Sequence, residues 1–314
     1  MVTPESPAVL ALAGGVGGAK LALGLARCLP SGDLVICVNT GDDETFHGLH
    51  VSPDLDTMMY TLSGLSNQET GWGVAGDTFT ALEMLEKFGV DTWFNLGDRD
   101  FATHIRRSQL LAEGKTLSEV TSELNQSLGV FHIVVPMSND PVKTVLSTDE
   151  GELPMQRYFV GRRAEPKVFE VRYVGVENAT AAPGLLDSLA KCGMLVLCPS
   201  NPYLSLGPIL ALPGVRQLMR DFSGKKVCVS PIVGGDAVKG PAGKIMAELG
   251  KQVSCVEVAQ EYRDICDVFV MDNEDQDLAS EIEEMGLTPL VTSTIMETEE
   301  DKIALAREIL ALAD

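Results

Sequence analysis

An apolar segment that ends in a cluster of glycines constrains the fold of this chain more than any other feature. Residues 8–13 (AVLALA) are apolar, and GGVGGAK follows at 14–20. Leucines then recur at helical spacing, and a second apolar segment, DLVICVN, lies at 33–39. A buried strand, a glycine turn, a helix and another buried strand predict a parallel sheet with helices on both faces.

The same alternation of apolar strand and helix returns in the second half of the chain. Strand segments that end in loops begin at Gly193, Gly224, Cys266 and Gly286. Helices are expected between and after them, at 183–191, 205–220, 240–250, 254–262, 276–285 and 299–313. We therefore predict an α/β, Rossmann-like core with a mostly parallel sheet, built from residues 1–136 and 179–314.

The middle of the chain has a different pattern. Helices are expected at 77–88 and 100–127, with a short strand at 93–97 between them. Four further segments predict strands with few helices between them: 131–137, 142–146, 155–161 and 167–176. Strands that follow one another this closely favour antiparallel pairing. We predict that residues 137–178 form an inserted, smaller, strand-rich subdomain.

Charge and composition exclude several classes of function. The chain has 24 Lys and Arg against 45 Asp and Glu, and a net charge of -21 repels nucleic-acid backbones. No apolar run approaches the ~20 residues of a membrane span, and MVTPESP lacks the features of a signal peptide. Seven cysteines without CxxC spacing fit buried, reduced thiols. We expect a cytoplasmic protein without nucleic-acid or membrane partners.

The glycine loop is a candidate phosphate site. Glycines let the backbone approach a ligand closely, and the following helix offers unpaired N–H groups to an anion. Because the spacing is neither GxGxxG nor GxxxxGK[ST], a tight turn without a ligand stays open as an alternative. The candidate nucleotide- and phosphate-binding residues here are Gly14, Gly15, Gly17, Gly18 and Lys20.

A cluster of aspartates follows the second strand. Asp42, Asp43, Asp54 and Asp56 lie within the stretch 39–57, where an open parallel sheet presents its binding crevice. Carboxylates without a nearby Lys or Arg repel one another unless a cation joins them, and oxygen ligands suit Mg²⁺. The alternative is a set of separate helix caps and turns.

Other polar loops also follow strands. Asp77 is expected to cap the helix that begins there, Arg99 and Arg106 could meet phosphates, and His104 is either structural or catalytic. Ser200 and Asn201 precede a helix start, and Lys239 and Lys244 follow the next strand. Each loop alone fits ordinary turn chemistry. Together they predict a large crevice for a phosphorylated, nucleotide-like ligand.

Several segments in combination resemble the 2-phospho-L-lactate transferases of coenzyme F-420 biosynthesis. They are GGVGGAKLALGL, NTGDD, HGLHVSPDLDT, GWGVAGDTF, LGDRDFATHI, PMSNDPV, PSNPYLSLGPILALPGVR and SPIVGGDAVKGPAGK. The resemblance runs from about residue 8 to the last helix, and at NTGDD and HGLHVSPDLDT it is stronger to the bacterial branch, which uses a phosphoenolpyruvyl donor.

The resemblance implies a Rossmann-like fold with an inserted subdomain, a Mg²⁺ requirement and two substrates. The donor would be a guanosine diphosphate-linked acid, and the acceptor the deazaflavin alcohol FO (7,8-didemethyl-8-hydroxy-5-deazariboflavin). In the family, residues at the positions of Asp56 and Asn95 contact FO, although archaeal members have lysine where this chain has Asn95. The acid on the donor stays open among lactate, enolpyruvate and glycerate.

The expected reaction is in-line attack of the FO ribityl hydroxyl on the phosphorus that bears the acid, with release of GMP. Asp43 and Asp56 are the expected Mg²⁺ ligands and catalytic residues, with Asp42 and Asp54 as alternates; Asp56 would also orient or deprotonate the hydroxyl. The glycine loop, Ser200 and Asn201 would bind the diphosphate and guanosine, and a homodimer is expected. The alternative function is a nucleotide-binding regulatory protein without transferase activity.

Overall fold

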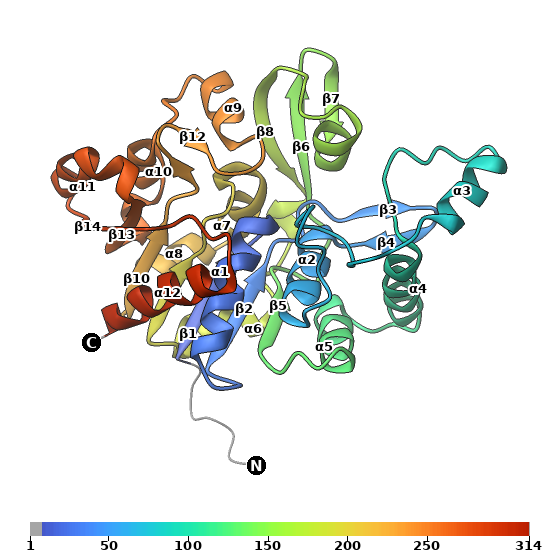
Figure 1. Ribbon diagram of the computed structural model, residues 1–314, viewed down its shortest axis with the longest axis horizontal. Coiled ribbons are helices and arrows are strands. Elements are labelled where there is room, and N and C mark those ends of the chain that lie inside the picture. Colours follow the sequence, from blue (N-terminus) through green and yellow to red (C-terminus); the bar gives the residue numbers. More distant parts are fainter. Residues whose placement is uncertain (1–7, 314) are drawn as a thin grey trace.

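The structure is a computed structural model and describes residues 8–313. Its central sheet consists of seven parallel strands (Figure 1). Across the sheet the strands are ordered β14 (Thr288–Thr292), β13 (Val268–Asp272), β10 (Lys225–Val229), β9 (Met194–Leu197), β1 (Val9–Ala13), β2 (Leu34–Val38) and β5 (Ile133–Pro136). Every neighbouring pair is parallel. The predicted Rossmann-like α/β architecture is confirmed.

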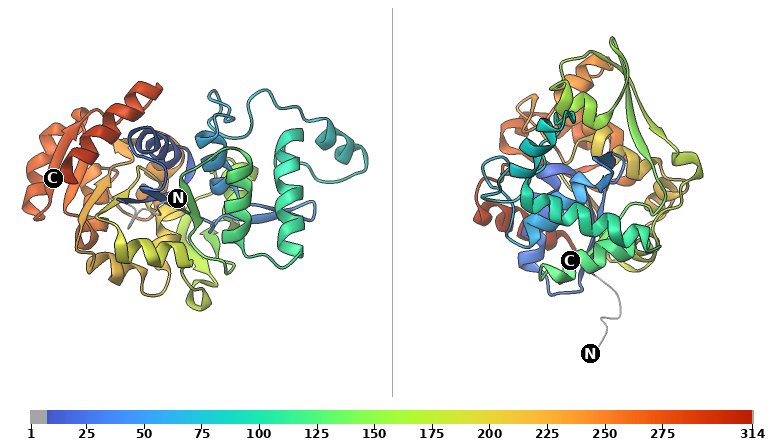
Figure 2. Two further views of the ribbon diagram at one scale, coloured as in Figure 1. Left: turned by 90° about the horizontal axis from the view of Figure 1, so that it is seen from below. Right: turned by 90° about the vertical axis from the view of Figure 1, so that its right-hand side faces the viewer.

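Alternate side chains of β1 enter two separate cores, one on each face of the sheet. Leu10 and Leu12 belong to the first, and Val9, Ala11 and Ala13 to the second. The first face is covered by α6 (Pro183–Lys191), α7 (Gly207–Ala211), α8 (Val215–Arg220), α9 (Ala242–Glu248), α10 (Cys255–Tyr262) and α11 (Ala279–Glu284). The second is covered by α1 (Gly15–Cys28), α2 (Pro53–Leu62) and α12 (Glu299–Leu310), as Figure 2 shows from below. Burial on both faces is why these strands are continuous apolar runs.

The order of strands reverses between β1 and β9. These two strands are neighbours, but the chain leaves β1 towards β2 and leaves β9 towards β10. The loops at their carboxyl ends therefore diverge, and open α/β sheets bind ligands in the crevice that this divergence creates. The glycine loop follows β1, and Ser200 and Asn201 follow β9.

A small antiparallel sheet lies within residues 137–178. Its strands, in the order β7 (Gly151–Pro154), β6 (Lys143–Thr148) and β8 (Val168–Val174), confirm the predicted antiparallel character. Its core joins Leu146, Tyr158 and Val168 to Leu204 and Ile245 of the main body. The division of the chain into a core and an inserted subdomain stays a prediction.

Other elements extend the molecule on the side of α2 and the edge strand β5. The hairpin β3 (Glu44–Phe46) and β4 (Leu49–Val51) lies beside α4 (Asp98–Ala112), and α3 (Thr80–Lys87) and α5 (Leu117–Ser127) flank that helix (Figure 1). A second short hairpin, β11 (Ile232–Val233) and β12 (Asp236–Ala237), follows β10. Within residues 8–313, no helix is both long and apolar enough to cross a bilayer.

The expected strand at 155–161 is wrong. Residues 155–156 are helical, and a π-helix follows at Arg157–Gly161. Its turn buries Tyr158 in the small core while Phe159 and Val160 line a cavity. An apolar run this short fits a strand and a helical turn equally well, which explains the error.

Other element boundaries also differ from expectation. The helix expected at 100–127 is two helices, because Gly114 at φ 91° reverses the chain and Thr116 caps α5. Residues 93–97 form no strand, and the hairpin of β3 and β4 was not anticipated. The helices expected at 205–220 and 276–285 begin as a π-helix (Pro202–Leu206) and a 3-10 helix (Asn273–Leu278), and the first is broken between α7 and α8.

Asp77 caps a different helix from the one expected. Its carboxylate accepts hydrogen bonds from the backbone N–H groups of Arg99 and Asp100, in the first turn of α4. In return Asp98 accepts from the backbone N–H groups of Thr80 and Ala81 in the first turn of α3. The two helix starts thus cap each other. The segment from Asp77 to Asp98, which contains Asn95, is held at both ends.

Gly24 provides a test of the packing of α1 on α12. A Cβ at Gly24 would lie 2.1 Å from the carbonyl oxygen of Lys302. Alanine normally stabilises a helix by about 1 kcal/mol over glycine, but here backbone must move. We predict that Gly24→Ala lowers the free energy of unfolding in urea by ~1–3 kcal/mol.

Gly243→Ala is the matched control. Its Cβ would come no closer than 3.1 Å to the Val253 side chain, 3.4 Å to Asp236 Oδ1 and 3.7 Å to the Ala237 nitrogen, so its effect should stay within about 1 kcal/mol. Equal losses of unfolding free energy for the two substitutions would show that the contact with the Lys302 carbonyl does not decide the effect at Gly24.

Candidate active site

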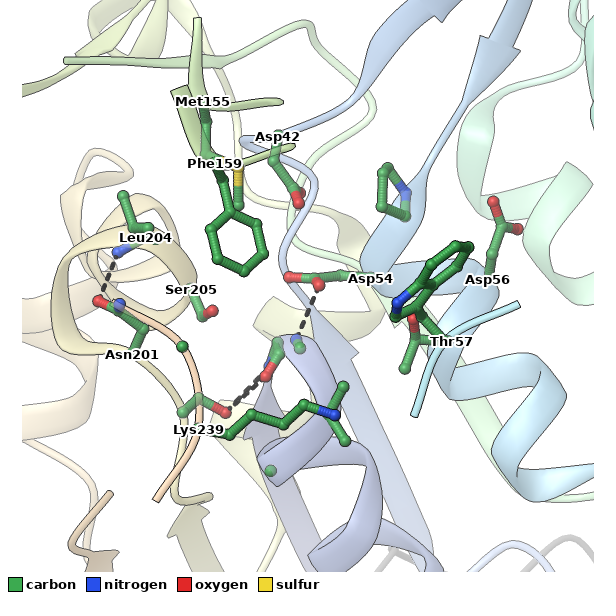
Figure 3. Close-up of a pocket in the computed structure, with 18 of the residues that line it drawn as sticks. Asp42, Asp54, Asp56, Thr57, Met155, Phe159, Asn201, Leu204, Ser205 and Lys239 are labelled. Atoms are coloured by element: carbon green, nitrogen blue, oxygen red, sulfur yellow. Dashed lines mark hydrogen bonds between the residues drawn. The ribbon is translucent and has the colours of Figure 1, made fainter. Parts of the chain in front are cut away.

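A cavity of about 400 Å³ lies at the carboxyl ends of the strands, next to the reversal between β1 and β9 (Figure 3). The loops after β1, β2, β9, β10 and β14 all contribute to its wall, together with α2 and the helical turn at 155–160. Most of the predicted site residues line it: Gly14, Gly15, Gly17, Lys20, Asp56, Asn95, Ser200 and Asn201. Two predicted site residues, Gly18 and Asp43, do not. His104 and Lys239 also line the cavity, whereas Lys244 does not.

The glycines of the first loop allow close contact between protein segments. A Cβ at Gly17 would lie 2.3 Å from the carbonyl oxygen of Pro199, and one at Gly18 would lie 2.5 Å from Ser200 Oγ. At Gly14 it would lie 2.6 Å from Asp54 Oδ2. Ser200 Oγ in turn donates to the Gly14 carbonyl at 2.8 Å. Glycine at these three positions is therefore needed to bring the loop after β1 against Asp54 and against the loop after β9.

Asp42 and Asp54 are held as a pair. The side-chain amide of Asn39 donates to Asp42 Oδ1 at 3.0 Å and to Asp54 Oδ2 at 2.9 Å. Asp54 Oδ1 also accepts from the Gly15 N–H at 2.7 Å, and Asp42 Oδ2 accepts from Gln156 Nε2 at 3.1 Å. Both carboxylates are buried and both face the cavity (Figure 3).

Burial and mutual repulsion raise the proton affinity of this pair. Burial, with repulsion from Asp43, raises the pKa of Asp54 to about 6. Burial and repulsion from Asp54 and Asp43 raise the pKa of Asp42 well above its usual range. Because each carboxylate destabilises the charged form of the others, the pair is suited to a cation.

Asp43 lies behind the cavity wall. Its Oδ2 accepts from Ser52 Oγ at 2.7 Å and lies 2.9 Å from His50 Nε2. Its Oδ1 is buried and has no hydrogen-bond partner among the described residues. An acceptor in that state is costly unless a cation or donor meets it.

Asp56 has a partner that the sequence analysis missed. Both of its oxygens accept hydrogen bonds from the guanidinium of Arg107, which is 2% exposed. His104 lies between Asp56 and Asp100, with Nδ1 3.7 Å from Asp56 Oδ2 and Nε2 3.2 Å from Asp100 Oδ1. Tyr60 donates to Asp100 at 2.7 Å.

Helical spacing could have placed Arg107 beside Asp100 and His104, although not beside Asp56. Asp100, His104 and Arg107 are four and three residues apart, which places them on one face of α4. The two arginines that the sequence analysis selected lie elsewhere. Arg99 donates to the backbone carbonyl of Ala75, and Arg106 pairs with Glu123 on the surface.

Two clusters of side chains contain candidate metal ligands. Asp56, Asp100 and His104 each place one ligand atom within 4.8 Å of the others. However, the guanidinium of Arg107 already neutralises Asp56 there. Asp42 and Asp54 have no cationic partner among the described residues, and the orphaned Asp43 Oδ1 belongs to the same stretch of chain.

Aromatic side chains form another part of the cavity wall. Tyr60, Trp72, Phe94 and Phe159 line it. Phe94 is braced by Phe46, with ring centroids 4.0 Å apart and nearly parallel planes. A cavity that combines these rings with a helix N-terminus and buried carboxylates suits a ligand with flat and phosphorylated parts.

The fold defines a Rossmann-like α/β protein, with a cavity at the reversal of strand order. The chain belongs to the family described as 2-phospho-L-lactate transferase CofD, whose model matches residues 9–308. It is thus a member of a family of transferases.

Individual relatives cover almost the whole chain. A 2-phospho-L-lactate transferase of Methanosarcina mazei is 38% identical over 302 residues, 96% of this chain and 99% of that protein. A phosphoenolpyruvate transferase of Streptomyces griseus is 39% identical over 312 residues, 98% of each chain. A crystal structure of a UPF0052 family member from Bacillus halodurans has a TM-score of 0.64 at 16% identity, over 98% of this chain and 99% of that one. This last likeness shows the fold alone.

The Asp56–Arg107 pair yields a stability prediction. Asp56→Asn keeps the shape of the side chain but leaves the buried guanidinium without a counter-charge. We predict a loss of about 3 kcal/mol or more in the free energy of unfolding in urea. The double variant Asp56→Asn/Arg107→Met removes both charges and should recover most of that loss.

Arg106→Met is the control, since it breaks an exposed pair of the same helix and should cost less than ~1 kcal/mol. An Asp56→Asn protein as stable as the wild type would show that the pair does not hold the site together.

Proposed function

We propose that this protein transfers a phospho-acid unit, 2-phospho-L-lactate or phosphoenolpyruvate, from a guanosine diphosphate-linked donor to FO. GMP is released, and the product is an intermediate of coenzyme F-420 biosynthesis. One observation carries the proposal: a single cavity brings the glycine loop, the buried aspartates and an aromatic wall together. Membership of a transferase family supports the same reaction class. A cytoplasmic homodimer stays our expectation from the sequence.

The donor is proposed to bind along the first turn of α1. This 14-residue helix begins at Gly15, and its N-terminal N–H groups favour an anion. Asn201 Oδ1 accepts from the backbone N–H groups of Tyr203 and Leu204, which leaves its side-chain NH₂ free to donate to a ligand. Lys20 adds an ammonium group to the same wall.

The acceptor is proposed to lie against the aromatic wall. The tricyclic ring of FO is flat and aromatic, and Trp72, Phe94 and Phe159 offer aromatic faces on which it can stack. Asn95 and Asp56 line the cavity beside these rings. We propose that both contact FO, with the Asn95 amide replacing the lysine of archaeal relatives.

The residues present fit a divalent cation. Asp42 and Asp54 face the cavity with raised pKa values, and Asp43 has a buried oxygen without a partner. Because Arg107 occupies both oxygens of Asp56, we now propose Asp42 and Asp54, with Asp43 behind them, as the Mg²⁺ site. The ion would neutralise charge on the transferred phosphoryl group.

The proposed chemistry leaves Asp56 for the attacking hydroxyl. Arg107 holds the Asp56 carboxylate in a fixed position, so that an oxygen can accept the hydrogen bond of the ribityl hydroxyl and later its proton. A bond forms between that hydroxyl oxygen and the phosphorus that bears the acid. The bond from the same phosphorus to the GMP oxygen breaks. The helix N-terminus and Lys20 stabilise the charge on the departing GMP.

The decisive experiment combines the protein with FO and Mg²⁺ and offers each of three donors, guanosine diphosphates of lactate, enolpyruvate and glycerate. We expect one donor to give an FO product of the corresponding mass, with one GMP per product. Absence of product from all three, with a protein that binds FO in a spectroscopic titration, would refute the transferase assignment for these substrates.

Metal removal gives a further prediction. We expect a chelator to abolish transfer and Mg²⁺ to restore it. We also expect Asp42→Asn or Asp54→Asn to lower the rate by more than about tenfold at fixed Mg²⁺.

Metal binding requires the deprotonated carboxylate, so Mg²⁺ affinity should fall as the pH drops through about 6, the raised pKa of Asp54. Asp221→Asn, on the surface, is the control. Full activity in excess chelator would remove the metal from the mechanism.

A further inference from the structure

Lys239 connects two loops at the rim of the cavity. It lies after β12, and its Nζ donates to the backbone carbonyl of Thr70 at 2.8 Å, 169 residues away in the sequence. Thr70 and Trp72, two residues further on, belong to the loop between α2 and α3. All three residues are exposed to solvent and line the cavity. Figure 3 shows the Lys239 side chain extended across the lower part of the site.

The Lys239 ammonium group lies beside the first turn of α1. A Cβ built on Gly71 would lie 2.6 Å from Lys239 Nζ and 3.0 Å from Val16 Cγ1. Lys239 Nζ and the second residue of α1 are therefore neighbours. The helix N-terminus and this ammonium group offer positive charge to the same part of the cavity.

A second lysine on the same wall has the same kind of partner. Lys20 Nζ donates to the Met296 carbonyl at 2.6 Å, as Lys239 does to Thr70. Within residues 8–313 neither ammonium group forms an ion pair, although the chain has 45 acidic residues against 24 basic ones. Burial lowers the pKa of Lys20, and the charges of Lys302 and Lys239 lower it further. Positive charges that repel one another beside a cavity are stabilised by an anion.

We propose that Lys239 is a phosphate-binding residue, which exchanges the Thr70 carbonyl for a phosphate oxygen of the donor. The inference rests on the proposed function, because it takes the donor to be a nucleoside diphosphate. A carbonyl offers a neutral acceptor, whereas a phosphate gives a charge-assisted hydrogen bond of about twice the strength. Occupation of the cavity by a diphosphate therefore favours the exchange. By this direct contact Lys239 fixes the diphosphate against α1 from the solvent side.

Calorimetry with two probes tests the proposal. GDP has the phosphates and guanosine lacks them. We expect Lys239→Gln to weaken GDP binding roughly ten- to hundredfold and to leave guanosine binding within about threefold of wild type. Lys239→Arg retains the charge and should recover most of the affinity for GDP. Lys191→Gln removes another exposed charge, which does not line the cavity, and should change neither.

A merely structural tie between the loops gives a different result. If Lys239 only holds Thr70, its replacement changes GDP and guanosine affinity equally, or changes neither, and either outcome overturns the proposal. If the wild-type protein does not bind GDP, the nucleotide side of the proposed function fails with it. Wild-type binding of GDP that Lys239→Gln leaves intact refutes the inference about Lys239 alone.

Trp72 offers a second measurement that leaves Lys239 unchanged. The chain has two tryptophans, so Trp93→Phe leaves Trp72 as the only one. Release of the Thr70 carbonyl by Lys239 should alter the emission of Trp72 when GDP binds and not when guanosine binds. Identical emission with GDP, with guanosine and without ligand would overturn the proposed exchange.

Discussion

The hydrogen bonds of Asp54 are the constraint on which the rest of the site depends. Its two oxygens accept from the Gly15 N–H and the Asn39 side chain, so one carboxylate joins the loops after β1 and β2 to α2. The contact requires glycine at position 14, where a Cβ would lie 2.6 Å from Asp54 Oδ2. The two donors offset part of the cost of burying a carboxylate. The remaining cost appears as the raised pKa of Asp54, and it is the part that a cation can relieve.

The core of the fold was predictable because its strands are buried on both faces. Such strands are continuous apolar runs, and the sequence shows them at β1, β2, β9, β10 and β13. Short elements were predicted less well. β3 and β4 have three residues each, too few to show a period, and the helical turn at 155–161 has an apolar pattern that fits both structures. In those places tertiary contacts, such as the burial of Tyr158, decide the conformation.

Which loops form the site could be predicted, but the pairing of their side chains could not. Glycines and aspartates that follow parallel strands must meet at one edge of the sheet, and most of the predicted residues do line one cavity. Adjacent residues nevertheless separate: Asp42 faces the cavity, whereas Asp43 turns to His50 and Ser52. Arg107 pairs with Asp56 across 51 positions, and no local pattern contains that information.

These pairings divide the charges of the cavity among separate tasks. Asp56 has a permanent counter-charge in Arg107, which holds its carboxylate in one geometry without a metal. Asp42 and Asp54 are held together only by neutral amides, so their charge is available to a ligand. Lys20 and Lys239, bound only to carbonyls, are available in the same sense with the opposite sign. The first turn of α1 lies between them, bonded to Asp54 through Gly15 and neighbouring Lys239 at Val16. A diphosphate placed there would meet uncompensated positive charge and reduce the repulsion between Lys20 and Lys239. A cation would meet uncompensated negative charge and reduce the repulsion between Asp42 and Asp54.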